Sequence, residues 1–330
     1  MRKAATTSYV PPTASTTTTS EPVPPSTSPS FINSVTNFIR NLHKAKGLRE
    51  PRKYEDYNRE AKDLFVTDAG EGFTVQLNKI IGQTAQHEFG LSHSVFVGGS
   101  GMRPPDYTTT VSFANKTTNL LSQIQLPHYI HFFMLKRKFL NEKLTTEVNY
   151  ANANNNLIAK ADYSDKDYVI DAQYDLEKGK IQISYMQSVL PFLQLGCSGF
   201  YRTSDRVSGL STCMRYQPTK EAVVTAEAKV SGPLSQANTY NLKASYYQQV
   251  GVDTFLCTEA TYDVSERTLN FIYGFQQMFQ QAKFRVTASQ DFNIKASFDI
   301  MPTMSTNINT SIDANPAKSE YKFGVAIQIN

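Results

Sequence analysis

The sequence has no long hydrophobic run, and this absence excludes an ordinary helical membrane protein. A membrane-spanning helix needs about 20 mostly apolar residues in succession. The apolar runs of this 330-residue chain are far shorter, as in residues 132–135. The N-terminus also lacks an apolar segment after Arg2 and Lys3, so we expect no cleaved secretory signal.

Cysteine is scarce, and tryptophan is absent. The three cysteines, Cys197, Cys213 and Cys257, are an odd number without a Cys-x-x-Cys spacing. This pattern predicts neither a disulfide framework nor a zinc site, and it fits a reducing compartment.

Enzyme motifs are also missing. The chain contains no Gly-x-Ser-x-Gly, no Walker loop and no His-Glu-x-x-His. The five histidines form no ligand pattern. His87 and His93 share a strand face, but six extended residues separate them by roughly 20 Å, too far for one metal ion. We therefore predict a non-enzymatic protein without a catalytic residue, metal or cofactor.

Charged residues make up only 19% of the chain, and the excess charge of +4 is confined to its beginning. Residues 1–66 hold ten basic and six acidic residues, whereas the 23 basic and 23 acidic residues that follow cancel. The main body thus has no global basic field, so we expect no nucleic-acid partner.

The first 70 residues differ from the rest of the chain. Residues 1–30 are rich in Ser, Thr and Pro, which predicts a disordered tail. Residues 31–70 form a predicted helical arm with two amphipathic stretches, because apolar residues recur there at a helical spacing. The first stretch presents Phe31, Val35, Phe38, Ile39 and Leu42; the second presents Tyr54, Tyr57, Ala61, Leu64 and Phe65.

From Glu71 to the C-terminus the hydrophobic period is two. Apolar and polar residues alternate in about nineteen segments of roughly ten residues, separated by turn signals such as residues 154–156 and 178–179. Ten residues suffice for a tilted strand to cross a bilayer. We therefore predict a β-domain over residues 71–330.

Alternation alone does not distinguish a soluble β-protein from a membrane barrel. The soluble fold faces its apolar side inward, whereas a membrane barrel faces lipid with apolar residues and its lumen with polar ones. About nineteen strands overfill a single sandwich, and the polar faces are rich in Asn, Gln, Ser and Thr. These features favour an all-β transmembrane barrel, in which a mean hydropathy of −0.39 averages a lipid face with a water face. A soluble β-rich binding protein remains the alternative.

The end of the chain favours a mitochondrial barrel. An odd number of strands makes the first and last strands run in the same direction and close the barrel in parallel, as in mitochondrial porins. Residues 322–329, KFGVAIQI, resemble the mitochondrial β-signal, which places a polar residue, a glycine and two hydrophobic residues at fixed spacings. The matching residues are Lys322, Gly324, Ile327 and Ile329.

Three further segments carry a family resemblance. Residues 185–196, YMQSVLPFLQLG, are similar to a Tyr-x-Gln-Ser-x-x-Pro-x-Leu-x-Leu-Gly strand turn. This segment, the hairpin of residues 72–95 and the helix of residues 54–65 resemble the import-channel subunit of the translocase of the outer mitochondrial membrane (TOM complex). This family belongs to the mitochondrial porin superfamily, and the resemblance covers roughly residues 50–330.

The voltage-dependent anion channel shares the barrel but fits less well. Chains of that family begin almost at the barrel, whereas about 70 residues precede the first predicted strand here. Their Gly-Leu-Lys strand motif is not evident, since residues 241–243 read Asn-Leu-Lys. A metabolite or anion porin of this type is the second candidate function.

The resemblance implies a channel that imports unfolded precursor proteins across the mitochondrial outer membrane. It implies, as partners, precursors with basic amphipathic presequences, receptor and small single-helix subunits of the TOM complex, membrane lipid, and a second or further barrel. It also places the helix that contains Tyr54, Tyr57, Leu64 and Phe65 inside the pore. Residues upstream would reach the intermembrane space, although the stretch of residues 31–42 could instead lie on the membrane surface.

Strand parity selects the residues that face the predicted lumen. Carboxylates there would attract basic presequences weakly at each site, so that transit continues. The candidate presequence-binding residues are Glu147, Asp162, Asp171, Asp175, Glu227, Asp253, Glu259 and Asp263. Seven basic residues share this parity, namely Lys160, Lys180, Arg215, Lys243, Lys283, Arg285 and Lys295. Any acidic patch must therefore be regional, and simple solvation of a polar face is the competing interpretation.

Overall fold

The computed structural model describes residues 48–66, 71–84, 86–98, 104–140, 142–233 and 239–330. The predicted tail of residues 1–30 and the helical stretch of residues 31–42 lie outside the described residues. Within the described part of the chain, no helix is both long and apolar enough to cross a membrane.

The described residues form nineteen strands, two 3₁₀ turns and one short α-helix. Before the first strand come η1 (Tyr54–Asp56) and α2 (Arg59–Leu64), and η2 (Asn152–Asn154) follows the sixth strand. The strands are β1 (Gly72–Gln83), β2 (His87–Val97), β3 (Asp106–Asn115), β4 (Thr118–Leu126), β5 (Ile130–Phe139), β6 (Leu144–Ala151), β7 (Asn156–Ser164), β8 (Tyr168–Asp175), β9 (Lys180–Leu190), β10 (Leu193–Arg202), β11 (Val207–Tyr216), β12 (Ala222–Pro233), β13 (Thr239–Gln249), β14 (Thr254–Asp263), β15 (Thr268–Met278), β16 (Ala282–Ser289), β17 (Ile294–Thr303), β18 (Thr306–Asn315) and β19 (Glu320–Ile329).

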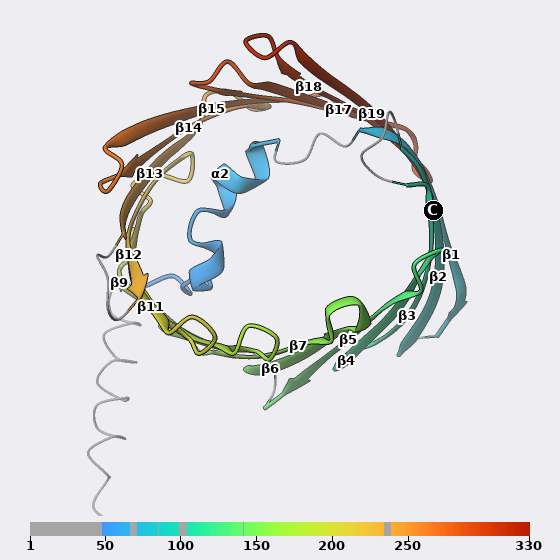
Figure 1. Ribbon diagram of the computed structural model, residues 1–330, viewed down its shortest axis with the longest axis horizontal. Helices are drawn as coiled ribbons and strands as arrows, with labels where there is room; N and C mark the ends of the chain where they lie inside the picture. Colours follow the sequence, from blue (N-terminus) through green and yellow to red (C-terminus); the bar gives the residue numbers. More distant parts are fainter. Residues whose placement is uncertain (1–47, 67–70, 85, 99–103, 141, 234–238) are drawn as a thin grey trace, which may run out of the picture. The chain divides into compact units, whose positions relative to one another are not determined.

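The strands close into one barrel (Figure 1). Each strand pairs antiparallel with its neighbour in sequence, and β1 pairs in parallel with β19, from Gly72 opposite Gly324 to Leu77 opposite Ile329. The parallel seam follows from the odd number of strands, and closure leaves no unpaired strand edge. The prediction of an all-β barrel of about nineteen strands with parallel closure is therefore confirmed.

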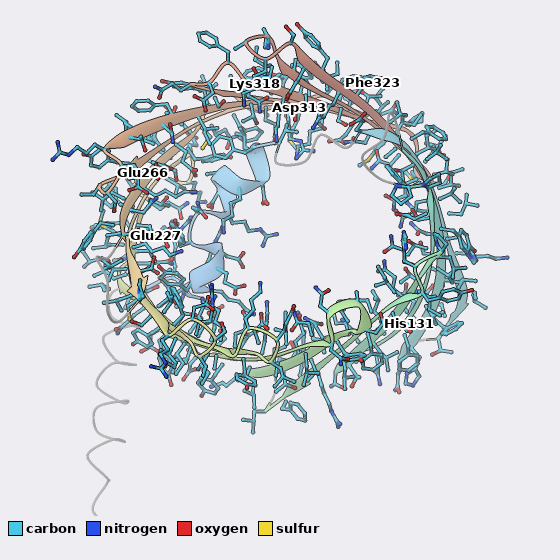
Figure 2. All side chains as sticks on the ribbon, in the orientation of Figure 1. His131, Glu227, Glu266, Asp313, Lys318 and Phe323 are labelled. Atoms are coloured by element: carbon cyan, nitrogen blue, oxygen red, sulfur yellow. The ribbon has the colours of Figure 1, made fainter. Side chains whose placement is uncertain are left out.

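The two faces of the wall have opposite polarity, and the polar face is the inner one. On β9, Ser184 is 3% exposed, whereas its neighbour Ile183 is 57% exposed. Large exposed side chains of the strands are mostly apolar, and buried strand residues are mostly Ser, Thr and other polar types. Figure 2 shows side chains on both faces of the wall, with Asp313 toward the lumen and Phe323 toward the outside. This inverted arrangement is that of a membrane barrel and not of a soluble β-protein.

The predicted β-signal forms most of the last strand. Gly324 faces the lumen and lies between Gly72 of β1 and Ser311 of β18, whereas Ile327 and Ile329 point outward. Lys322 faces the lumen opposite Asp313. The segment thus supplies one side of the closing seam, and its role in assembly stays a prediction.

Adjacent residues on β14 test the assignment of the faces. Ala260 points outward between Ala244 and Phe271, and Thr261 points into the lumen between Lys243 and Asn270. We expect Ala260→Arg to lower the free energy of unfolding in bilayers by about 2–4 kcal/mol, because it places a guanidinium in hydrocarbon. Thr261→Arg should lower the free energy of unfolding clearly less, because its guanidinium points into the lumen. Urea titration of the refolded barrel measures both, and equal losses would contradict the assignment.

Candidate functional site

A segment of the chain lies against the inner wall of the barrel. This pore segment, residues 48–66, contains η1 and α2 (Figure 1). The 3₁₀ turn η1 contacts β9 and β10, and α2 contacts β13, β14 and β15. The helix has only six residues and ends where Phe65 adopts an extended conformation. The predicted pore residues Tyr54, Tyr57, Leu64 and Phe65 are all buried against the wall.

Two tyrosines fix the first part of the pore segment. The hydroxyl of Tyr57 donates to Glu227 Oε2 at 2.7 Å, and that of Tyr54 donates to Glu227 Oε1 at 3.1 Å. Tyr54 Oη also lies 2.5 Å from Ser211 Oγ. Burial raises the pKa of both tyrosines above the ordinary value of 10.0, and the Glu227 carboxylate adds to the rise. Both hydroxyls therefore stay protonated, and Glu227 is occupied by the chain's own donors.

An ion pair fixes the middle of the segment. Arg215 of β11 is 3% exposed, and its two terminal nitrogens donate to the two carboxylate oxygens of Glu60 at 2.7 Å each. Arg215 Nη1 also donates to the carbonyl of Tyr57 at 3.0 Å. Burial would raise the pKa of Glu60, but the hydrogen bonds and charge of Arg215 outweigh it, and the pKa falls below 4.5. The paired charges stabilise each other in a site that water reaches poorly.

Apolar packing holds the end of the segment. Ala61, Leu64 and Phe65 cluster with Cys257 of β14. Gly274 of β15 leaves room for this cluster, because a Cβ at that position would collide with Leu64 Cδ2 and the ring of Phe65. The backbone N–H of Val66 then donates to Thr287 Oγ1 at 2.7 Å.

Beside η1 lies a cavity of about 190 Å³, which we call the acidic pocket. Its charged lining residues are Lys53, Glu55, Asp56, Glu147, Lys160, Asp162 and Asp171. Five carboxylates thus face two ammonium groups, an excess of three negative charges. The wall strands β6, β7 and β8 supply Glu147, Lys160, Asp162 and Asp171. The pore segment supplies Lys53, Glu55 and Asp56.

The acidic pocket is only partly neutralised from within. Lys53 Nζ donates to Asp162 Oδ2. Burial lowers the pKa of Lys53, but Asp162, Asp171 and Asp56 together raise it more, so the net shift is upward. Lys160 and Glu55 approach no closer than 4.0 Å. Asp171 lies directly opposite Asp162 in the β7–β8 ladder, and its Oδ1 atom is buried without a hydrogen-bond partner.

The structure separates the other predicted carboxylates from this pocket. Glu259 pairs with Lys243 at 2.7 Å, Asp175 accepts from the N–H of Lys178 at 3.2 Å, and Asp263 accepts from two N–H groups of the following turn. Asp253 immediately precedes β14, which begins at Thr254, and its carbonyl accepts the N–H of Met278 at the end of β15. Of the eight predicted residues, Glu147, Asp162 and Asp171 come together in one pocket.

Sequence reasoning missed the pore-segment charges that complete the site. Lys53, Glu55 and Asp56 line the acidic pocket, and Glu60 anchors the helix. The charged face of the stretch of residues 54–65 was the available signal, but it does not specify which wall residues it meets.

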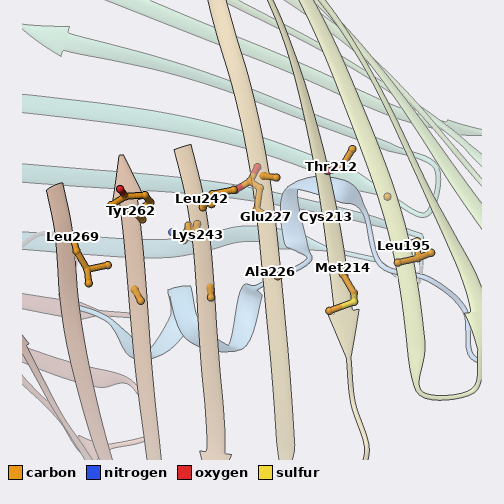
Figure 3. Close-up of a pocket in the computed structure, with 14 residues that line it drawn as sticks. Leu195, Thr212, Cys213, Met214, Ala226, Glu227, Leu242, Lys243, Tyr262 and Leu269 are labelled. Atoms are coloured by element: carbon orange, nitrogen blue, oxygen red, sulfur yellow. The ribbon is translucent and has the colours of Figure 1, made fainter. Parts of the chain in front are cut away.

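A second hollow, of about 670 Å³, lies on the outer face of β10 to β15 (Figure 3). Its floor is a row of small residues, since Ala226, Ala244 and Ala260 are direct neighbours on β12, β13 and β14. Leu195, Met214, Leu242, Tyr262 and Leu269 surround them, and α2 lies behind the same wall. The hollow opens toward lipid and is separate from the lumen.

Comparisons with known proteins agree with the fold and with the resemblance. The eukaryotic porin family model matches residues 50–324. The chain is 23% identical over 298 residues to the "Probable mitochondrial import receptor subunit TOM40-2" of Arabidopsis thaliana, covering 84% of this chain and 89% of that one. Together these matches confirm the predicted resemblance to the import channel of the mitochondrial porin superfamily.

Solved structures of mutant porins from Rhodopseudomonas blastica also align with this chain. They are 10–11% identical and cover 74% of this chain and 96–97% of theirs, with TM-scores of 0.45 and 0.46. A likeness at this level adds nothing to the assignment.

The buried thiol of Cys257 reports whether α2 is in place. We expect Gly274→Ala to displace Leu64 and Phe65, since overpacking costs about 1–3 kcal/mol. A water-soluble maleimide should then label Cys257 faster. Gly199→Ala is the matched control, because only a carbonyl oxygen at 4.0 Å approaches its added Cβ. Unchanged labelling in Gly274→Ala would show that the packing of α2 does not protect Cys257.

Proposed function

Because the chain belongs to the eukaryotic porin family and is a non-enzymatic β-barrel channel of the mitochondrial outer membrane, we propose that it conducts unfolded precursor proteins through its lumen. The observation that carries the proposal is the acidic pocket, in which three wall carboxylates and two pore-segment carboxylates face two ammonium groups. A mitochondrial presequence is a basic amphipathic segment. Its positive side chains are the complement of this pocket.

The strength of the pocket suits transit better than capture. The ammonium group of Lys53 and the carboxylate of Glu55 remain partly exposed to the lumen, and single exposed charge pairs contribute about 0.2–1 kcal/mol. Each contact therefore favours entry of a basic chain without holding it, which conduction requires.

The lumen also has room for an extended chain. The pore segment lies against one side of the wall, and the side chains of the described residues leave the middle of the lumen open in Figure 2. Barrels of this strand number enclose an aqueous channel, yet one too narrow for a folded domain. Precursors would cross unfolded or as single helices.

The import relative supports a place for this chain in a TOM complex. Its partners there would be receptor and small single-helix subunits, together with a second barrel. The apolar outer face of the wall provides the surface that such membrane-embedded partners need.

A metabolite or anion channel is the second candidate, and one observation favours it. Lys180 and Lys229 place their ammonium groups 5.1 and 6.0 Å from the ring centre of Phe200, and Lys180 also donates to Gln182 at the edge of the acidic pocket. These residues and Arg202 face the lumen together. They form a basic region that would favour small anions.

Planar-bilayer recording separates the two functions. A basic amphipathic peptide should block a cation-preferring current through the wild-type channel. Asp162→Asn with Asp171→Asn should weaken this block about fivefold or more, because each removed charge is worth up to about 1 kcal/mol. Glu177→Gln with Glu266→Gln, both in exposed turns, removes the same charge elsewhere and should change the block little. An anion-preferring current that ignores the peptide would support the metabolite channel instead.

A further inference from the structure

The two opposed carboxylates of the acidic pocket attract a cation. Asp162 and Asp171 are direct partners in the β7–β8 ladder, and like charges directly opposite each other destabilise a sheet. The structure supplies a single ammonium group there, that of Lys53, which binds Asp162. Oδ1 of Asp171 is left without a hydrogen bond.

The cation comes from the pore segment and not from the wall. Lys53 immediately precedes η1, whose N-cap position it occupies. The wall lysine of the pocket, Lys160, lies instead toward Glu55. Lys53 therefore enters the pocket from the lumen side, which is also the side from which a passing chain would approach.

The contact of Lys53 differs from the other anchors of the segment in its exposure and in its number of hydrogen bonds. The side chain of Lys53 is 40% exposed and ends in one ammonium group. Arg215 is 3% exposed and donates two hydrogen bonds to Glu60. An ion pair with one half-exposed partner contributes little to the free energy of folding. Tyr54 and Tyr57 remain fixed to Glu227. Lys53 can thus leave the pocket by turning its own side chain, while the segment stays in place.

We propose that Lys53 is a placeholder cation that a basic side chain of the passing polypeptide replaces. When no polypeptide is present, Lys53 occupies the Asp162–Asp171 pair. A passing polypeptide must displace Lys53, so its net binding free energy is the difference between its own attraction to the carboxylates and that of Lys53. The lysine therefore sets how much positive charge a segment needs to enter the pocket. Lys53 is then a specificity-determining residue, and this role rests on the proposed function.

A purely structural role for Lys53 leads to the opposite expectation. If its ion pair only held the pore segment, loss of the ammonium group would loosen the segment, and the affinity of the pocket for a basic peptide would stay the same or fall. If Lys53 is a placeholder, the same loss should raise that affinity and leave the segment docked.

The experiment is peptide block of the full-length channel in planar bilayers at low salt. The probe is a basic amphipathic peptide with four arginines, and a glutamine-substituted peptide serves as the uncharged comparison. We expect Lys53→Gln to tighten the block by the arginine peptide roughly two- to fivefold, the worth of one exposed pair. Lys53→Arg should stay near wild type. Lys283→Gln removes an equal charge from the lumen face of β16 and should not tighten the block.

A second measurement guards against a displaced segment. Cys213 is buried beneath Tyr54 and Tyr57, so maleimide labelling of Cys213 in Lys53→Gln should remain as slow as in wild type. Faster labelling would show that the contact is structural and would overturn the proposal. An unchanged or weaker block in Lys53→Gln would also overturn it, and so would a block that does not depend on Asp162 and Asp171. If the arginine peptide fails to block the wild-type channel, the proposed function itself is overturned.

Discussion

The need to satisfy every backbone N–H and C=O group inside hydrocarbon determines this structure. Lipid offers no hydrogen-bond partners, so a chain that crosses it with strands must close them into a barrel. With nineteen strands, the first and last run in the same direction, and β1 and β19 meet in parallel. Closure then divides the residues of each strand between two solvents, which gives the wall an apolar outer face and a polar lumen.

The polar lumen in turn allows a stretch of chain to be held inside it. The wall presents hydroxyl groups, carboxylates and a guanidinium, and the pore segment uses them through Tyr57 with Glu227 and through Glu60 with Arg215. These contacts contrast with the pair of Lys53 and Asp162, in which the lysine side chain is 40% exposed. The polar lumen that results from closure therefore provides a fixed element and, as we propose, an exchangeable one.

The sequence predicts the barrel well because a period of two is local. Parity alone places Asp162, Asp171 and Glu227 on the inner face, and the structure agrees. Parity does not determine where Asp253 points, because parity holds only within a strand and β14 begins one residue later. The docking of the pore segment on the wall could not be predicted, since Lys53 and Asp162 are 109 residues apart and Glu60 and Arg215 are 155 apart. A face assignment does not say where around the wall the pore segment docks.

In the proposed function, a basic precursor passes the acidic pocket on its way through the lumen. A photo-crosslinker at Gln173 faces the lumen within this pocket, whereas one at the next residue, Tyr174, faces outward. A precursor arrested in the channel should crosslink through its presequence to position 173 and not to position 174. Crosslinks confined to other parts of the lumen, with none at position 173, would contradict the account.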